Sequence, residues 1–434
     1  MLRTIGVASV DELFGDLPAG VRLGRELDLE PALSEHELSA HMADLAARNV
    51  DVTRELSFLG AGIYDHYVPA VVDTVLQRGE FLTAYTPYQP EMSQGVLQSI
   101  FEYQTAICEL TGMDVSNASG YDGETVAADA CYIAKHATGK AKVVITEATN
   151  PQVRQVVKTY APGFGLEVVE VPHRDGTTDV DALAAASTGA AAVIFQQPNF
   201  FGCLEPAPDL AAAANEADAL SIAHVDPLSL GVLEAPGRYG CAIALGEGQA
   251  AGNLMAYGGP HYGFLAARQE FIRRMPGRIV GETVDTEGAR GYVLTLQTRE
   301  QHIRREKATS NITTNQTLLA LGGLVYLTWL GPQGLRELGE ACLALGEYAK
   351  RRLQERAGLE LVFPDRTTFK EFAVRAGRNA REVIRDARAL GVHPGYALGR
   401  DYEGMDDVLL VAVTEKRTPE ESDRLADVLA EVAR

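Results

Sequence analysis

The residue with the clearest chemical potential in this sequence is an aspartate at the end of an apolar run. Asp226 follows the segment 220–225 in the sequence HVDPLSLG. A carboxylate at the carboxyl end of a buried strand can keep a proton on the ring nitrogen of an aromatic cofactor bound above it. A turn explains the residue equally well, because Asp before Pro227 often begins one. Both interpretations stay open at this point.

A second candidate is the run of small residues at 116–125, SNASGYDGET, which leads into the helical segment VAADACYIA. Backbone N–H groups at a helix start can bind a phosphate. However, Asp122 and Glu124 would repel a dianion there, and ordinary helix capping accounts for both acids. The pattern therefore favours capping over phosphate binding.

Lysine is missing where a site of this kind would need it. Only eight of the 39 basic residues are lysines, and none lies between 159 and 306. Pyridoxal enzymes hold their cofactor as a Schiff base on a lysine, which should follow the acid by some tens of residues. Gln249 stands near that place, and an amide cannot form an imine. We therefore expect no catalytic residue in this chain alone, and no covalently held cofactor.

Strands and helices alternate through the middle of the chain, and they must position these residues. Such alternation is typical of a mainly parallel α/β sheet. The strands are predicted at 142–146, 166–171, 191–195 and 220–225, and the helices at 150–160, 179–187 and 208–219.

The flanking segments complete a three-part plan. Residues 1–70 are predicted to be an N-terminal helical arm and interface loop, with helix starts at Ser9 and Ser34. Residues 71–325 form the large α/β domain and 326–434 a small C-terminal α+β domain. This order resembles the aspartate-aminotransferase-like fold, fold type I of the pyridoxal-phosphate-dependent transferases, and we predict that fold class.

Composition excludes several classes of function. The net charge of −20 argues against nucleic-acid and anionic-membrane binding. No apolar run of about 18 residues and no signal peptide are evident, so we expect a cytoplasmic protein that spans no membrane. Five scattered cysteines indicate buried free thiols, and no metal-binding motif is present.

Long motifs carry a specific resemblance over essentially the whole chain, from Ile5 onward. They include TAYTPYQPE, ELTGMDV, NLMAYGGPHYGF and EKATSNITTNQ. These stretches are similar to the N-terminal (alpha) subunit of bacterial two-subunit glycine dehydrogenase (decarboxylating), the P-protein of the glycine cleavage system. The absence of the lysine agrees with that family, in which the related beta subunit carries it.

The resemblance implies a heteromeric enzyme, glycine dehydrogenase (aminomethyl-transferring). In an α2β2 heterotetramer, the beta subunit binds pyridoxal phosphate. Glycine is decarboxylated there, its aminomethyl group passes to the lipoyl arm of the H-protein, and CO2 is released. The chain alone is expected to be inactive, and Asp226 is then a vestigial cofactor-site position.

Two segments rich in Gly, Tyr and Pro, 57–67 and 85–95, are the candidates for completing the partner's active site. Their phenol, imidazole and amide groups suit a carboxylate or a ring, although aromatic packing in an obligate interface explains them as well. The candidate residues are Tyr64, His66, Tyr85, Tyr88 and Gln89.

Three functions compete at this stage. The first is the site-completing subunit described above. The second is a catalytically inert scaffold that only stabilises the beta subunit or docks the H-protein. The third, an independent enzyme that uses the old cleft, lacks any recognisable nucleophile–base motif. A basic run at Arg304, Arg305 and Lys307 could meet a phosphate or an acidic H-protein surface, but a solvated helix face explains it more simply.

Overall fold

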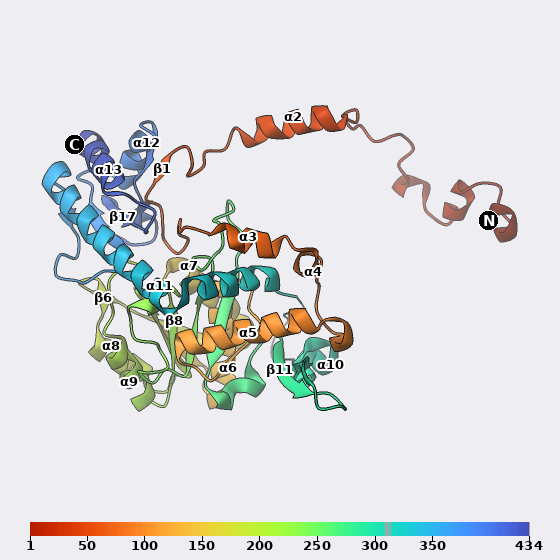
Figure 1. Cartoon of the computed structure of the whole chain (residues 1–434), viewed down its shortest axis with the longest axis horizontal. Helices are drawn as coiled ribbons and strands as arrows, with labels where there is room; N and C mark the ends of the chain where they lie inside the picture. The colour runs from red at the N-terminus through yellow and green to blue at the C-terminus, as the bar shows by residue number, and fades with distance from the viewer. Residues whose placement is uncertain (309–311, 313, 434) are drawn as a thin grey trace. The chain divides into compact units, whose positions relative to one another are not determined.

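The computed structural model describes residues 1–308, 312 and 314–433. The chain divides into two compact units, Met1–Arg54 and Glu55–Arg434. Figure 1 shows both units along the chain from red to blue.

The first unit consists of short helices joined by extended segments. They are α1 (Leu2–Ile5), η1 (Asp11–Phe14), η2 (Ala19–Val21) and α2 (Glu35–Ala46). The predicted start at Ser34 is confirmed, because its hydroxyl accepts the N–H of Glu37 in a capping box. The predicted start at Ser9 precedes only the 3₁₀ turn η1. None of these helices has a buried residue.

The core of the second unit is a seven-stranded sheet with the order β2-β10-β9-β8-β7-β3-β4. Strands β3, β4, β7, β8 and β9 are parallel, whereas β10 runs antiparallel to both of its neighbours. The bounds are β2 Val115–Ser116, β3 Lys142–Thr146, β4 Glu167–Val171, β7 Ala192–Gln197, β8 Leu220–Val225, β9 Ile243–Glu247 and β10 Gly263–Ala267. The prediction of a mainly parallel sheet is therefore confirmed.

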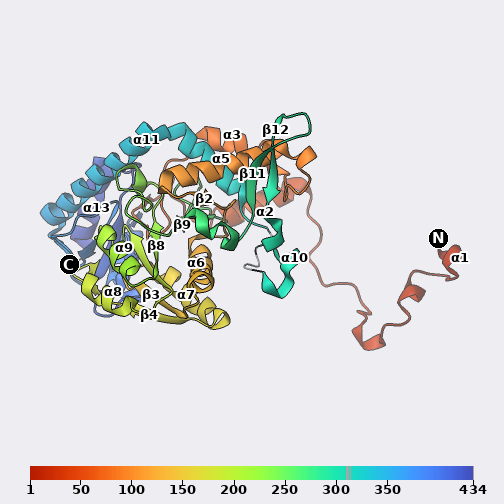
Figure 2. The ribbon, with the colours of Figure 1, turned by 90° about the horizontal axis from the view of Figure 1, so that it is seen from below.

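Helices cover both faces of this sheet, because alternate side chains along each strand point to opposite sides. In β3, Val144 belongs to one apolar cluster, and Val143 and Ile145 belong to the other. Helices α5 (Gln94–Thr111), α8 (Val180–Ser187) and α9 (Ala207–Glu216) pack on the first face. Helices α6 (Gly123–Thr138) and α7 (Pro151–Phe164) pack on the second, and Figure 2 shows these layers from below.

Strands β9 and β10 and one hairpin were not predicted. The hairpin pairs β11 (Ile279–Val284) with β12 (Arg290–Thr295). The segment after it contains α10 (Gln301–Arg304) and η7 (Arg305–Lys307). The predicted basic run lies on these two short elements and is exposed.

Helix α11 (Thr317–Arg352) connects the large sheet to the C-terminal part. By length and composition alone it could cross a membrane. However, it bends at Gly331, whose φ of 62° and ψ of −179° are not helical, and Pro332 follows. It also packs against α3 (Ala70–Leu76), α5 and the C-terminal helix α13 (Pro419–Val432), so it is a core helix of this unit.

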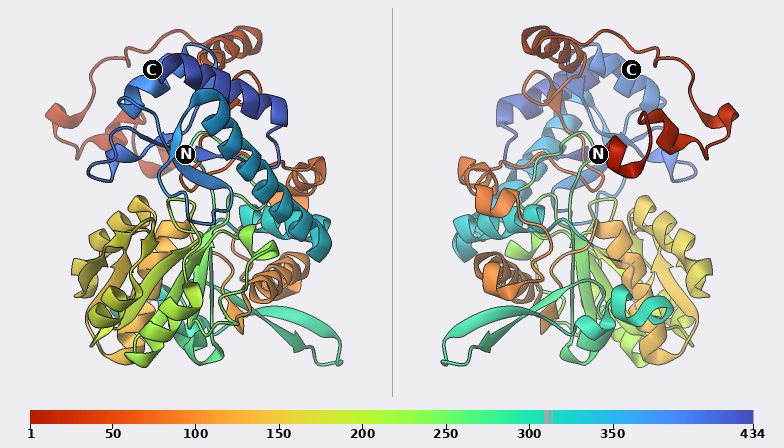
Figure 3. Two further views of the ribbon diagram at one scale, coloured as in Figure 1. Left: turned by 90° about the vertical axis from the view of Figure 1, so that its left-hand side faces the viewer. Right: turned by 90° about the vertical axis from the view of Figure 1, so that its right-hand side faces the viewer.

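The C-terminal part is a four-stranded sheet, β13-β14-β17-β16, with helices α12 (Ala380–Arg388) and α13. The strands are β13 Glu360–Leu361, β14 Glu371–Arg375, β16 Tyr396–Ala397 and β17 Val408–Ala412. A two-stranded parallel pair, β1 (Leu56–Ser57) with β15 (Val392–His393), joins the segment after residue 54 to this part. Figure 3 shows the C-terminal part, in blue, beyond one end of the large sheet.

Candidate functional site

Three of the sequence candidates meet at the carboxyl edge of the large sheet. Asp226 follows β8, Gln249 lies two residues beyond β9, and Asp122 caps α6. In open α/β sheets, ligands bind in the crevice outside the carboxyl ends of the strands. The sheet therefore places these residues where a ligand site is expected.

A lysine from the C-terminal part reaches this edge. Lys370 precedes β14, and its Nζ lies 2.5 Å from Oδ2 of Asp226. The side chain of Lys370 is only 2% exposed and that of Asp226 12%. Burial opposes the charge on Asp226, but the ammonium of Lys370 holds the pKa of this carboxyl below its ordinary value. Asp226 is thus ionised and paired within the chain.

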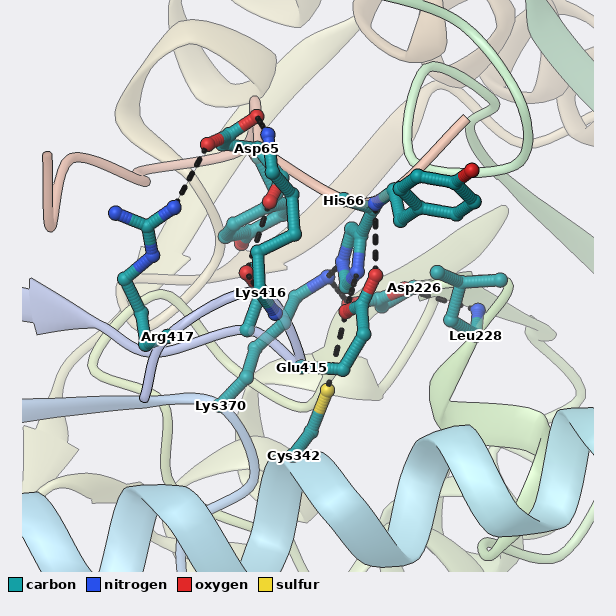
Figure 4. A network of polar contacts seen from close by, with 12 residues as sticks. Asp65, His66, Asp226, Leu228, Cys342, Lys370, Glu415, Lys416 and Arg417 are labelled. Carbon is teal, nitrogen blue, oxygen red and sulfur yellow. Dashed lines mark hydrogen bonds and ion pairs between the residues drawn. The ribbon is translucent and has the colours of Figure 1, made fainter. Parts of the chain in front are cut away.

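Lys370 also begins a chain of hydrogen bonds that passes through the imidazole of His66 (Figure 4). Lys370 Nζ donates to Nε2 of His66 at 2.9 Å, and Nδ1 of His66 lies 2.6 Å from Oε2 of Glu415. An ammonium can only donate, so Nε2 is the acceptor and Nδ1 carries the proton. Burial and the nearby Lys370 lower the pKa of His66, which keeps the ring neutral.

The phenol of Tyr64 closes the same space from another side. Its ring centroid lies 3.5 Å from Nζ of Lys370, and its hydroxyl donates to Glu371 at 2.7 Å. Burial raises the pKa of Glu371 to about 7. Gln249 accepts the N–H of Tyr64 at 2.9 Å and donates back to the carbonyl of Tyr64 at 3.0 Å. The amide of Gln249 is therefore hydrogen-bonded through both its oxygen and its nitrogen to the backbone of Tyr64.

The start of α6 is satisfied by the chain's own acids. The N–H of Gly123 donates to Glu247 at 3.0 Å, and the N–H of Thr125 donates to Asp122 at 2.7 Å. Burial raises the pKa of Glu247 to about 8 and that of Glu124 to about 7. Two N–H donors at this helix start are thus occupied by side-chain carboxyl groups of the chain, which agrees with the capping interpretation.

The cavity between these residues is small. The cavity has a volume of about 30 Å³ and is lined by Glu124, His224, Asp226 and Glu247 among others. A space of this size holds one or two waters. Burial lowers the pKa of His224 to about 4, so its ring is neutral there.

The five residues predicted to complete a partner's site fall into two groups. Tyr64 and His66 are buried and bonded within this chain. Tyr85, Tyr88 and Gln89 are exposed, and the hydroxyl of Tyr88 accepts a hydrogen bond from Arg278 at 2.7 Å. The fold does not bring the two groups together.

Sequence reasoning missed Lys370, Glu371 and Glu415. The first two lie at the start of the apolar strand β14, and a lysine at the start of a buried strand was the available signal. Glu415 gave no signal, because its partner His66 lies 349 residues away. The motif EKATSNITTNQ falls partly outside the described residues, at 309–311 and 313.

One cluster has metal-ligand chemistry. Ligand atoms of His66, Cys342 and Glu415 lie within 4.8 Å of one another. However, Nδ1 of His66 already bonds Glu415, and burial raises the pKa of the Cys342 thiol to about 12. All five cysteines are free. The cluster is explained by its own hydrogen bonds.

Solved structures define the class of this fold. The chain superposes on a glutamate decarboxylase of Lactobacillus brevis with a TM-score of 0.70 at 12% identity, covering 97% of each chain. Together with the mainly parallel sheet and the acid at its carboxyl edge, this shows the predicted fold type I of pyridoxal-phosphate-dependent proteins.

A family model described as the glycine cleavage system P-protein matches residues 1–429, and the chain belongs to this family. It is similar to proteins named "probable glycine dehydrogenase (decarboxylating) subunit 1". That of Moorella thermoacetica is 50% identical, covering 98% of this chain and 95% of the relative. That of Carboxydothermus hydrogenoformans is 51% identical, with 99% and 96% covered. A crystal structure of glycine decarboxylase (P-protein), in inhibitor-bound form, superposes with a TM-score of 0.92 at 43% identity, covering 100% and 97%.

The cofactor of this fold does not fit the residues present here. Gln249 offers an amide in place of an amine, and Asp226 is already neutralised by Lys370. The ammonium of Lys370 is paired with this acid and is not free to react as an amine. Carboxylates occupy the helix start where a phosphate would bind, and the cavity is water-sized. No step of a reaction is therefore derived through a cofactor in this chain.

Proposed function

We propose that this chain is the lysine-less subunit of glycine decarboxylase, which acts with a related subunit that carries the cofactor lysine. The observation that supports this most directly is the closed site: Gln249 stands at the lysine position, and Asp226 is paired with Lys370. The name of the relatives, subunit 1, supports the existence of a second subunit. We propose an α2β2 heterotetramer in the cytoplasm.

The reaction of the assembly is the oxidative decarboxylation of glycine. Pyridoxal phosphate on the partner supplies the electron sink when it is bound there. Glycine loses CO2, and its aminomethyl group passes to the lipoyl arm of the H-protein, whose disulfide is reduced. This chain alone is then inactive, and its role is to shape and stabilise the partner's site.

An exposed apolar surface supports the contact with a partner. Four large apolar side chains are 53% to 79% exposed: Leu82, Tyr85, Met92 and Trp329. Tyr85 lines an apolar groove together with Phe81, Ile100, Leu318 and Leu321 among others. Apolar and aromatic side chains at this density are typical of the core of an obligate interface. The exposed Tyr85, Tyr88 and Gln89 are the residues that we propose reach the partner's site.

The N-terminal unit supports the same contact independently. Its helices bury nothing, yet Leu13, Phe14, Leu38 and Met42 are large and apolar, and each is at least 45% exposed. An arm of this composition is stabilised when a partner chain covers it. We propose the arm and interface loop at 1–70, the large domain at 71–325 and the small domain at 326–434 as the functional parts of the subunit.

The inert scaffold stays as the second candidate, because one specific observation favours it. The hydroxyl proton of Tyr64 and both ring nitrogens of His66 are engaged in hydrogen bonds within this chain, and both side chains are buried. Under this alternative, the chain stabilises the partner or docks the H-protein without touching the reacting groups.

Reconstitution of glycine–CO2 exchange with H-protein separates the candidates. We expect no exchange from this chain alone, and exchange on mixing it with the lysine-bearing subunit. Tyr85→Phe should then lower turnover while the heteromer still forms, with Tyr160→Phe on the outer face of α7 as the matched control. Unchanged turnover for the Tyr85, Tyr88 and Gln89 variants would favour the scaffold, and exchange from this chain alone would exclude both.

A further inference from the structure

Lys370 makes more contacts with the vestigial site than a chance ion pair would. Its Nζ lies 2.5 Å from Asp226, 2.9 Å from Nε2 of His66 and 3.5 Å from the ring centroid of Tyr64. A carboxylate, a neutral imidazole acceptor and the face of a phenol are the three groups that favour an ammonium ion. Tyr64 and His66 belong to one segment, 57–67, whereas Asp226 follows β8, and Figure 4 shows His66 and Asp226 beside Lys370.

The surroundings keep this cation dry and paired. Glu415 fixes the His66 tautomer that accepts from the lysine, and Glu371 fixes the hydroxyl of Tyr64. Gln249 holds the backbone of Tyr64 through two hydrogen bonds. Asp226 in turn accepts the N–H of Leu228 at 3.0 Å, so each of the three groups is oriented by a second group, which is the organisation of a binding site.

We propose that the carboxyl edge of this sheet is a binding site for a primary ammonium ion, and that Lys370 is its built-in ligand. The lysine takes the place against Asp226 that a protonated ring nitrogen would need, so the site is filled by the chain itself. Because Lys370 precedes β14 and Asp226 follows β8, the same ion pair fastens the C-terminal part to the large sheet. The proposal concerns this chain alone and does not depend on its role in a complex.

The substitution Lys370→Ala tests the site directly. It removes three methylene groups and the nitrogen, which are the heavy atoms of n-propylammonium. We expect the full-length variant to melt about 5 °C below the wild type, because a buried carboxylate loses its cation. n-Propylammonium should restore most of this loss saturably, at roughly millimolar concentration. Equal concentrations of 1-propanol, at matched ionic strength, should not.

A matched control is Lys416→Ala. Lys416 also pairs with an aspartate, its Nζ lying 2.6 Å from Oδ1 of Asp65, but its side chain is 29% exposed. Water can replace this ammonium, so we expect a smaller loss and no saturable recovery with n-propylammonium. Equal recovery in both variants, or none in Lys370→Ala, would overturn the proposed site.

A pH series keeps the proposal testable if the alanine variant does not fold. In Lys370→Met the shape is kept and Asp226 loses its cation, so the folded-state pKa of Asp226 rises above its unfolded value. Stability is then lost as pH rises through that pKa, and the deficit against the wild type should shrink between pH 8 and pH 5. The double variant Asp226→Asn/Lys370→Met keeps His66, Tyr64, Glu371 and Glu415 and should lack this trend. A pH-independent deficit in Lys370→Met would overturn the ion pair as the fastening contact.

Discussion

Two segments that were predicted to do the same thing differ in burial: candidate residues of one are buried, and those of the other are exposed. The segment 57–67 is rich in Gly and Tyr, and the segment 85–95 is rich in Tyr and Pro. The first is fixed to its own chain through Glu371, Glu415 and Gln249, and its Tyr64 and His66 are buried. The second leaves Tyr85 76% exposed. Composition alone does not show whether such a segment packs inside the chain or lies at its surface. The difference depends on residues such as Glu371 and Glu415, which come from distant parts of the sequence.

The largest expected effect comes from breaking the buried ion pair between Asp226 and Lys370. In Asp226→Ala, Lys370 remains buried without its carboxylate partner. The free energy of unfolding should fall by about 3–5 kcal/mol, as it does when one member of a buried pair is removed. Urea unfolding of the full-length chain measures this. A loss within about 0.5 kcal/mol, the usual range for surface substitutions, would contradict a buried, uncompensated lysine.

A smaller effect is expected on the external surface. Tyr85→Ala should raise the dissociation constant for the lysine-bearing subunit about tenfold, because a truncated interface aromatic commonly costs more than 1 kcal/mol. The unfolding of the isolated chain should not change, since Tyr85 is exposed. Titration by calorimetry, with Tyr160→Ala as control, measures the affinity. An unchanged affinity would place the partner elsewhere on the molecule.

The smallest expected effect concerns the protonation of Glu124 and its contribution to stability. Burial raises the pKa of Glu124 to about 7. A carboxyl whose folded-state pKa is raised favours folding below its unfolded pKa and loses that contribution as pH rises through about 7. Glu124→Gln should therefore stabilise the chain at pH 8 by about 1 kcal/mol, allowing for solvent screening, and leave it unchanged at pH 5.

Urea unfolding at the two pH values checks this, with the exposed Glu91→Gln as the matched control. Equal effects of Glu124→Gln at pH 5 and pH 8 would contradict a raised pKa at that position.

Much of the large sheet could be predicted because its signals are local. The strands at 142–146 and 220–225 are β-branched or apolar runs, and the structure has them with the predicted bounds. Strands β9 and β10 were missed because half of the residues in IALGE and GFLAA are Gly or Ala, which carry little strand preference. The hairpin β11–β12 was missed because much of it lies at the surface.

The candidate site could be predicted only in part, for a related reason. Asp226 and Gln249 follow strands of the large sheet, so chain order indicated their place. Lys370 comes from a different sheet, and no sequence spacing relates it to Asp226. The lysine beside Asp226 comes from 144 residues further along the chain, so only the tertiary fold reveals the pair.

The most direct test of the central claim is the location of the cofactor in the assembled enzyme. The complex of this chain with its lysine-bearing partner would be loaded with pyridoxal phosphate and reduced with borohydride, and the mass of each chain would then be measured. Our account predicts one phosphopyridoxyl group on the partner and an unmodified mass for this chain. A stoichiometric adduct on this chain, at Lys370 or any other lysine, would contradict the claim that its site is closed and lysine-less in function.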